Sequence, residues 1–301
     1  MISELLIQDT YMKQAEDIVA SVGIPSQPAI MMEINDEINN PNSDLQSVSE
    51  IISRDVATAA KLLKVINSAF FGLGEKVDSI QRALSLMGLQ NFKKIILSSA
   101  LREAFCSKSS GSEKFWKHSM QTATIAARIA EKVGYNPLDQ AYIAGLFHDC
   151  GVPLLMKKFP DYHEVTDYAL SVVGADSLTG KTKSVIVVED ERYNIHHCAL
   201  GHLVAKSWRL SDAVIQVILY HHYVDIDCHK DSSVRKLSAI LFLADYLAAY
   251  LLYLSGGSPI DSEDEWAAMH KQVVAELEFE IEDIKDLKDE AEEQLYNFDE
   301  H

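Results

Sequence analysis

The sequence predicts an all-α protein, and its periodicity and composition carry the prediction. Nearly every patterned segment repeats apolar residues at intervals of three and four, which places them on one face of a helix, rather than alternating them as a strand does. Hydrophobic residues make up 48% and charged residues 24% of the chain, as in folded globular proteins. With 301 residues, the chain is long enough for one large domain or two modest ones.

The first half of the chain contains several expected helices. Asp44 ends a turn and stands where it can cap a helix that runs through the pair Ile51 and Ile52. A helical tract covers Ile51–Ile66. Two more follow over Ser79–Met87 and Asn91–Ala100, with Gly88 as the break between them.

The Ser/Gly cluster Ser107–Ser112 is the best candidate linker. It divides a helical half, over about 15–106, from a second half over about 113–254. Residues 262–301 form an acidic helical extension, for which a solvated amphipathic helix docked on the domain is favoured over a partner-binding arm. Its apolar positions are Leu277, Ile281, Ile284 and Leu287.

Charge and hydropathy exclude several classes of partner. The chain has 27 basic and 45 acidic residues, a formal charge of −18, which would repel nucleic acid. The longest apolar run, Ala239–Leu254, is short for a membrane span and contains Asp245, so it predicts a buried helix. The start of the chain lacks the pattern of a secretory signal. Four scattered cysteines without a CxxC pair suit a reducing cytosol, where we interpret them as small buried thiols. We therefore expect a cytoplasmic protein that contacts neither nucleic acid nor membrane.

Polar side chains interrupt the apolar faces of five predicted helices. His118, for example, shares its face with Ile125 and Ile129, and stepping back from His148 reaches Gly145 and Ala141. The inward-facing groups are His118, His148, His197, His221 and Asp245.

A single inward imidazole is explained by hydrogen bonds to backbone carbonyls. An isolated buried carboxylate, however, has to be paired, protonated or bound to a cation, because its desolvation costs several kcal/mol. The whole set is most simply satisfied around a metal. Imidazole and carboxylate ligands suit Fe, Mn, Zn, Ni or Co without distinguishing them. His148 and Asp149 project about 100° apart on a helix. The two side chains can therefore bind the same ion only if it lies at the edge of the region they both reach. Otherwise Asp149 bridges two ions.

The order and spacing of His118, the pair His148-Asp149 and Asp245 resemble the HD superfamily of metal-dependent phosphohydrolases. Over most of the chain, from 15 to 254, the sequence is similar to the HDOD family, the HD-related output domains of bacterial signalling. This resemblance implies an N-terminal helical bundle packed on a distorted HD-type helical domain. The matching motifs are Ile24–Pro28, Ile51–Asp55, Leu62-Leu63 with Asn67–Ala69, Ser79-Ile80, Ala83, Met87–Leu89, Phe115–Ser119 and Gly145–Asp149.

Most HDOD domains look like HD folds that have lost catalytic residues, whereas this chain retains them. The retained positions are similar to those of the two-metal HD-GYP phosphodiesterases, and Glu191 also stands at a matching position. The resemblance implies a first ion held by His118, His148, Asp149 and Asp245. It implies a second ion held by Asp149 together with His197, His221 and His222.

Three departures favour metal binding over catalysis. Gly151 is followed by Val152 where active relatives have a phosphate-contacting lysine, and the chain reads HHYVDIDCHK where they have the GYP stretch. Lys114 takes the place of a carboxylate found in some three-metal members. We therefore expect a bacterial signalling module that binds one or two ions and acts mainly through protein partners whose identity the sequence leaves open. The alternative is a metal-dependent phosphohydrolase of a nucleotide or cyclic dinucleotide, in which Asp149 is catalytic and the metals activate a water.

One further motif would predict a nucleotide-binding loop in place of the metal centre. Ala175–Thr182 fits the loose pattern of a phosphate-binding loop. The sequence that follows, SVIVVEDE, is β-branched and predicts an extended segment instead of the helix that such a loop requires. We therefore favour a connecting loop.

Overall fold

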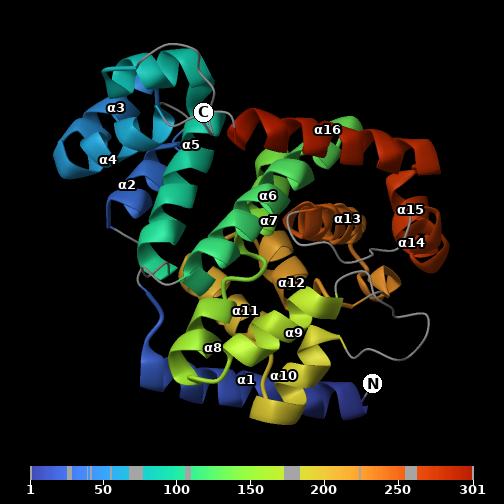
Figure 1. The fold of residues 1–301 in the computed structure, drawn as a ribbon. Coiled ribbons are helices and arrows are strands. Elements are labelled where there is room, and N and C mark those ends of the chain that lie inside the picture. Colours follow the sequence, from blue (N-terminus) through green and yellow to red (C-terminus); the bar gives the residue numbers. More distant parts are fainter. Residues whose placement is uncertain are drawn as a thin grey trace. The chain divides into compact units, whose positions relative to one another are not determined.

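The structure is a computed structural model that describes residues 2–25, 29–38, 40, 43–54, 56–67, 77–105, 110–172, 184–223, 225–254 and 263–299. Every long regular element in these ranges is an α-helix, which confirms the predicted fold class (Figure 1). The helices are α1 (Ile2–Val22), α2 (Ala29–Ile38), α3 (Leu45–Ser53), α4 (Val56–Ile66), α5 (Ile80–Phe105), α6 (Ser110–Lys132), α7 (Leu138–Phe147), α8 (Val152–Lys158), α9 (His163–Val172), α10 (Val185–Tyr193), α11 (His197–Ser207), α12 (Asp212–Tyr220), α13 (Ser232–Leu254), α14 (Glu263–Met269), α15 (Lys271–Leu277) and α16 (Ile281–Asp299), with a short 3₁₀ helix, η2 (Ile226–Cys228).

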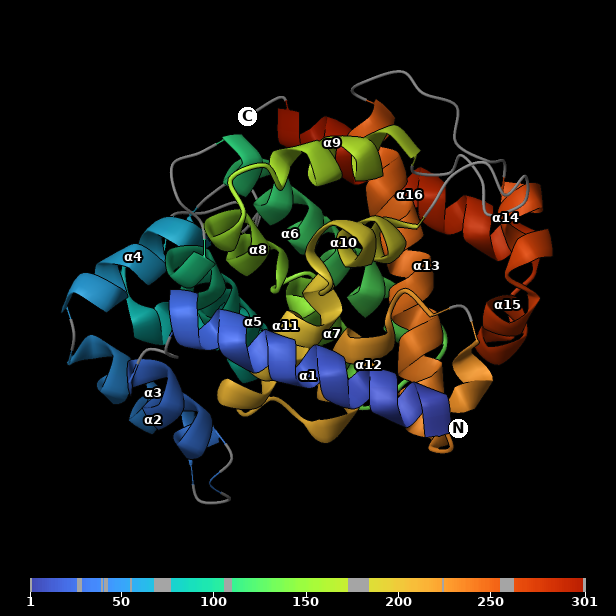
Figure 2. The same cartoon turned by 90° about the horizontal axis from the view of Figure 1, so that it is seen from below.

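The chain divides into two compact units. One contains residues 26–106 and 294–301, and the other contains residues 1–25 and 107–293. The helical half predicted over about 15–106 stays a prediction, and α1 belongs to the larger unit. There α1 packs along α11 and α8 (Figure 2). Lys157 Nζ donates a hydrogen bond to Val22 O (2.6 Å), and Trp208 Nε1 donates to Pro25 O (2.9 Å).

In the smaller unit, α3 and α4 pack on α5. Asp44 caps α3 as predicted: its carboxylate accepts a hydrogen bond from Ser47 N (2.8 Å), and the Ser47 hydroxyl accepts one from Asp44 N (3.3 Å). The tract predicted over Ile51–Ile66 is divided, because α3 ends at Ser53 and α4 begins at Val56. Gly88 has φ +73°, so it interrupts the helical geometry of α5 at the predicted break.

In the larger unit, α7 and α13 pack against α6, and α12 packs against α11 and α13. Gly145 allows the contact between α6 and α7, since a Cβ atom there would lie 2.6 Å from Ala123 Cα. Gly151 has the same role beside α11, where a Cβ would lie 2.0 Å from the His197 carbonyl oxygen. The contact at Gly151 places the turn after α7 directly against the start of α11.

The helix α13 is the buried helix predicted from the apolar run, and Leu237, Leu241 and Ala248 along it have no exposed surface. Among the helices that the structure describes, none has the length and apolar character needed to cross a bilayer.

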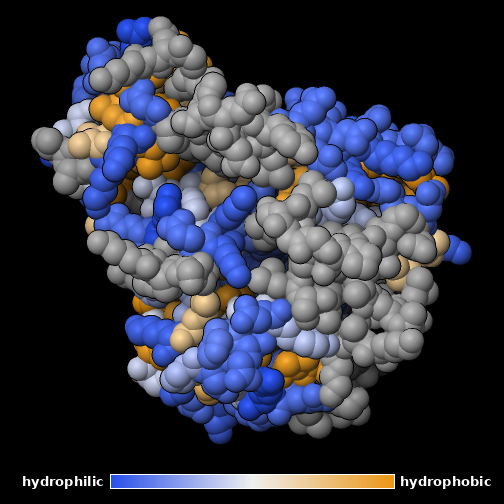
Figure 3. All heavy atoms as spheres, viewed as in Figure 1, coloured by the Kyte–Doolittle hydropathy of each residue, from blue (hydrophilic) through white to orange (hydrophobic). Residues whose placement is uncertain are grey.

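The acidic helix α16 is docked through two of the predicted apolar positions, whereas a third, Ile281, is exposed and the fourth, Leu277, lies on α15. Ile284 and Leu287 are buried, and two ion pairs join the helix to α6. Lys132 Nζ lies 3.1 Å from Asp283 Oδ1, and Arg128 Nε lies 2.8 Å from Glu290 Oε2. The outer surface of α16 is mainly hydrophilic (Figure 3).

The segment SVIVVEDE forms the helix α10, so the predicted extended segment was wrong. β-Branched residues disfavour a helix by only tenths of a kcal/mol each, an amount that tertiary contacts override. The contact here is made by Glu189, which is completely buried. The loop Ala175–Thr182 lies outside the described residues.

Candidate metal centre

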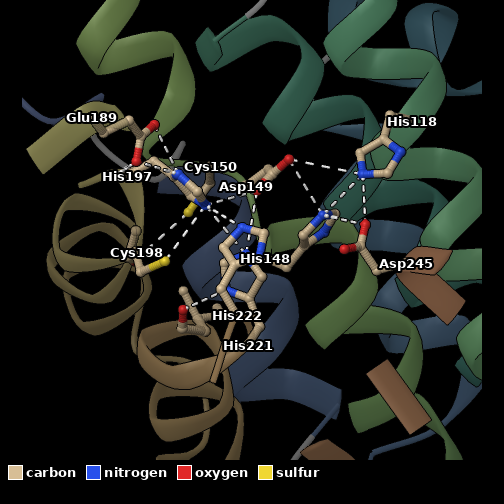
Figure 4. A network of polar contacts seen from close by, with 12 residues as sticks. His118, His148, Asp149, Cys150, Glu189, His197, Cys198, His221, His222 and Asp245 are labelled. Carbon is tan, nitrogen blue, oxygen red and sulfur yellow. Dashed lines mark hydrogen bonds and ion pairs between the residues drawn. The ribbon is translucent and has the colours of Figure 1, made fainter. Parts of the chain in front are cut away.

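The seven sequence-predicted ligands converge in the larger unit, although they come from five separate parts of the chain (Figure 4). His148 ends α7 and His221 ends α12, so each leaves its helix at the last turn. Asp149 lies in the turn after α7, and His222 follows His221. The remaining three lie within helices: His118 on α6, His197 at the start of α11 and Asp245 on α13.

Four of these side chains form a first donor set. His118 Nε2 lies 2.9 Å from Asp245 Oδ1 and 3.1 Å from His148 Nε2. His148 Nε2 lies 3.4 Å from Asp149 Oδ2 and 3.6 Å from Asp245 Oδ1. Ligands about 2.1 Å from one cation would lie about 3.0 to 3.4 Å apart in octahedral or tetrahedral geometry. The first donor set therefore has the spacing of a metal site.

A second donor set lies on the other side of Asp149. Asp149 Oδ1 is 3.2 Å from His197 Nε2 and 3.4 Å from His221 Nε2. His197 Nε2 is 3.3 Å from His221 Nε2 and 3.1 Å from His222 Nε2. One oxygen of Asp149 thus faces each donor set, which is the arrangement of a carboxylate that bridges two cations.

Hydrogen bonds at the outer nitrogens determine what the imidazoles present to the centre. His148 Nδ1 donates to Gly145 O (2.7 Å), and His221 Nδ1 donates to Ile218 O (2.8 Å). Since a carbonyl only accepts, Nδ1 carries the proton, and Nε2 of the neutral ring presents a lone pair. Two nitrogen lone pairs about 3 Å apart repel each other unless a proton or a cation lies between them.

Glu189 is the functional residue that the sequence analysis missed. Its carboxylate accepts hydrogen bonds from His197 Nδ1 (2.8 Å) and His197 N (3.0 Å), and it also bonds the hydroxyl of Tyr162. The predicted residue was Glu191, which is exposed, because two positions along α10 turn a side chain to the opposite face. Glu189 follows Val185 at the helical spacing of four, which places the two residues on one face of a helix. The sequence analysis did not use this spacing, because it predicted an extended segment here.

The charges of the ligands follow from burial and from one another. Burial lowers the pKa of His148, but Asp149 and Asp245 outweigh it and raise that pKa to about 10. Burial raises the pKa of Asp149, yet His148 and the other imidazoles hold it well below its usual range. Burial and the neighbouring His221 lower the pKa of His222 to about 3, so this imidazole is neutral. Without a metal, the carboxylates of Asp149 and Asp245 are ionised, and the His148 ring is in the doubly protonated, positively charged form.

Solvent reaches the centre at side chains of both donor sets, since His222 of the second set is partly exposed while His148 of the first set is only 1% exposed. The side chains of His118, Asp149 and Asp245 are 15%, 20% and 28% exposed, respectively. Those of His197 and His221 are only 2% and 1% exposed. Asp149 and Asp245 are therefore accessible to a ligand from solution.

The described residues thus form an all-α fold whose larger unit has a histidine- and aspartate-lined centre. The chain belongs to the HDOD domain family, whose sequence profile matches residues 24–224. This match confirms the resemblance.

Two uncharacterised bacterial proteins resemble the chain in sequence. One from Treponema pallidum (strain Nichols) is 27% identical over 239 residues, which cover 79% of this chain and 44% of that protein. The other, YuxH of Bacillus subtilis (strain 168), is 27% identical over 116 residues, which cover 38% of this chain and 28% of that protein. The chain thus matches less than half the length of either relative.

Solved structures share the fold. An HDOD domain protein of unknown function from Geobacter sulfurreducens is 25% identical with a TM-score of 0.63, covering 94% of this chain and 98% of that one. A "Putative phosphohydrolase" from Shewanella amazonensis is 20% identical with a TM-score of 0.67, covering 93% of this chain and 95% of that one. A "Putative signal transduction protein" from Marinobacter aquaeolei has a TM-score of 0.71 at 20% identity, covering 93% of this chain and 59% of that one.

Proposed function

We propose that this chain is an HDOD protein whose larger unit binds two divalent cations and hydrolyses a phosphoester. The observation that carries the proposal is the position of Asp149, whose two oxygens each face a separate set of donors at metal-ligand spacing. His118, His148 and Asp245 would complete the first set, and His197, His221 and His222 the second. The donor chemistry suits Fe, Mn, Zn or Ni.

Each residue has a role that its contacts support. Two bound cations would supply electrostatic stabilisation of a phosphoryl group and an activated water. Asp149 would hold both cations at a fixed separation. Glu189 orients the His197 ring and fixes its tautomer. Asp149 and Asp245 are accessible to solvent, and a phosphoester would enter beside them.

A panel of phosphomonoesters and phosphodiesters tests the proposal. Protein loaded with Mn²⁺, Fe²⁺ or Zn²⁺ is expected to hydrolyse at least one of them slowly, because Val152 takes the place of the phosphate-contacting lysine. Asp149→Ala should reduce the rate at least about 100-fold, since it removes a ligand of both ions. Glu191→Gln, an exposed carboxylate two residues from Glu189, is the matched control and should keep the wild-type rate. A fully loaded protein that leaves every ester intact would contradict the catalytic proposal.

A second candidate function is a signalling module in which the metals only stabilise the fold and protein partners provide the output. Val152, in place of the lysine, is the observation that favours it. If this second candidate is correct, the protein hydrolyses none of the phosphoesters in the panel, and its stability depends on bound metal.

A further inference from the structure

The sulfur of Cys198 lies within the second donor set. Cys198 follows His197 at the start of α11 and is completely buried. Its Sγ is 3.5 Å from His197 Nε2, and the ligand atoms of Cys198, His197, His221 and His222 all lie within 4.8 Å of one another. Figure 4 shows the sulfur directed toward the His197 ring.

The separations fit one cation bound by sulfur and nitrogen together. A tetrahedral zinc ion with a bond of about 2.3 Å to sulfur and about 2.05 Å to nitrogen places sulfur about 3.6 Å from nitrogen, and nitrogens about 3.3 Å from each other. The corresponding distances here are 3.5 Å for Cys198 Sγ to His197 Nε2 and 3.1 to 3.3 Å between imidazole nitrogens. The described donors of the first set, by contrast, are two imidazole nitrogens and two carboxylate oxygens.

Cys150 shows what a packing thiol looks like in the same unit. It is also fully buried, but its Sγ lies 3.6 Å from the backbone oxygen of Gly201, a partner that satisfies a thiol without any metal. Cys198 instead has an imidazole nitrogen of the second donor set, His197 Nε2, as its partner at 3.5 Å, so its sulfur faces the same space as the proposed ligands. Our interpretation of all four cysteines as small buried thiols therefore fits Cys150 better than Cys198. It is wrong for Cys228, which is exposed, and Cys106 lies outside the described residues.

We propose that Cys198 is a thiolate ligand of the second cation, which makes the two metal positions chemically different. The inference rests on the proposed two-metal centre and adds a ligand that the family resemblance did not supply. On binding, the thiol releases its proton to solvent and the sulfur lone pair forms the metal bond. The second position, with three nitrogens, one sulfur and one oxygen of Asp149, prefers zinc-like cations. The first, with two nitrogens and two oxygens, accepts manganese or iron.

Cobalt substitution tests the proposal with a readout other than activity. The full chain is stripped, loaded with Co²⁺ and examined for the sulfur-to-cobalt charge-transfer absorption in the near ultraviolet. Wild type should show this band, and Cys198→Ser should lose it while its cobalt content falls by about half. Cys150→Ser is the matched control and should keep both the band and the cobalt. A band that persists in Cys198→Ser would overturn the assignment.

X-ray absorption on wild-type protein loaded with Zn²⁺ needs no variant, so it decides the question even if Cys198→Ser does not fold. A sulfur scatterer at about 2.3 Å supports the proposal. Bound zinc with only nitrogen and oxygen neighbours refutes the Cys198 ligand and leaves the two-metal centre standing. Protein that binds neither zinc nor cobalt by elemental analysis refutes the centre itself, and the inference with it.

Discussion

At the scale of single residues, the outer hydrogen bonds of the histidines matter as much as the inner donors. His148 and His221 use carbonyls of their own helices, which any helix can provide. His197 uses the carboxylate of Glu189, which comes from a different helix and is fully buried. Glu189 therefore links the position of α10 to the geometry of the second donor set.

Removing the charge of Glu189 should weaken the second metal position. Glu189→Gln keeps the size of the side chain, but its amide NH₂ can face His197 Nδ1 and favour the wrong tautomer. We expect the affinity of one of the two metal positions to fall about 10- to 100-fold, measured by competition with a chromogenic chelator. Glu191→Gln controls for a general change of charge on α10. Equal affinities in both variants would show that Glu189 does not orient a ligand.

At the scale of helices, periodicity explains why so much of the centre was predictable. The spacing of three and four showed that His118, His197 and Asp245 face inward, because it fixes the direction of each side chain on its own helix. It does not fix distances between helices, so the sequence alone could not show that Asp149 presents one oxygen to each donor set. Assignment of these residues as metal ligands remains a prediction.

Two features of the centre escaped the sequence analysis for different reasons. Glu189 was missed because β-branched residues suggested an extended segment where tertiary contacts favour α10. Cys198 was missed because a buried thiol is usually a packing residue, and only its distance from His197 distinguishes it from Cys150. Both depend on contacts between helices, which local patterns do not encode.

The contact between the turn after α7 and the start of α11 can be tested at Gly151. Gly151→Ala would place a Cβ 2.0 Å from the His197 carbonyl oxygen, which forces the backbones apart. We expect a loss of about 1 to 3 kcal/mol in the free energy of unfolding and a weaker second metal position, measured by urea unfolding and metal titration. Gly201→Ala is the milder control, since its Cβ would lie 3.0 Å from the Ile218 side chain and 3.6 Å, an ordinary contact distance, from Cys150 Sγ and Gly151 N. An equal or larger effect at Gly201 would contradict this account of the packing.

At the scale of the whole molecule, the centre joins parts of the larger unit that are far apart in sequence. Its ligands extend from His118 on α6 to Asp245 on α13. Three carboxylates, those of Asp149, Asp245 and Glu189, lie within or against it. Cations that bind only the folded arrangement should therefore stabilise the whole unit.

Metal removal should lower the melting temperature, by an amount that depends on pH. Binding at about 100 times the dissociation constant contributes about 2.7 kcal/mol, which corresponds to roughly 5 to 10 °C for a unit of this size. In the metal-free protein His148 has a pKa of about 10, raised above its unfolded value of 6.5. Its protonation therefore stabilises the metal-free fold fully below pH 6.5, and this contribution is lost as the pH rises toward 10. A cation must also displace that proton, so its affinity rises over the same window.

Because the cation displaces this proton, the difference in melting temperature between metal-loaded and chelator-stripped protein should be larger at pH 8 than at pH 6. Differential scanning calorimetry at the two pH values, with metal content checked by elemental analysis, measures it. His148→Ala should reduce the difference, because it removes a ligand of the first cation, whereas His163→Ala, which removes an exposed imidazole, should leave it unchanged. A difference that shrinks between pH 6 and pH 8 would mean that the bound cation does not replace the proton on His148.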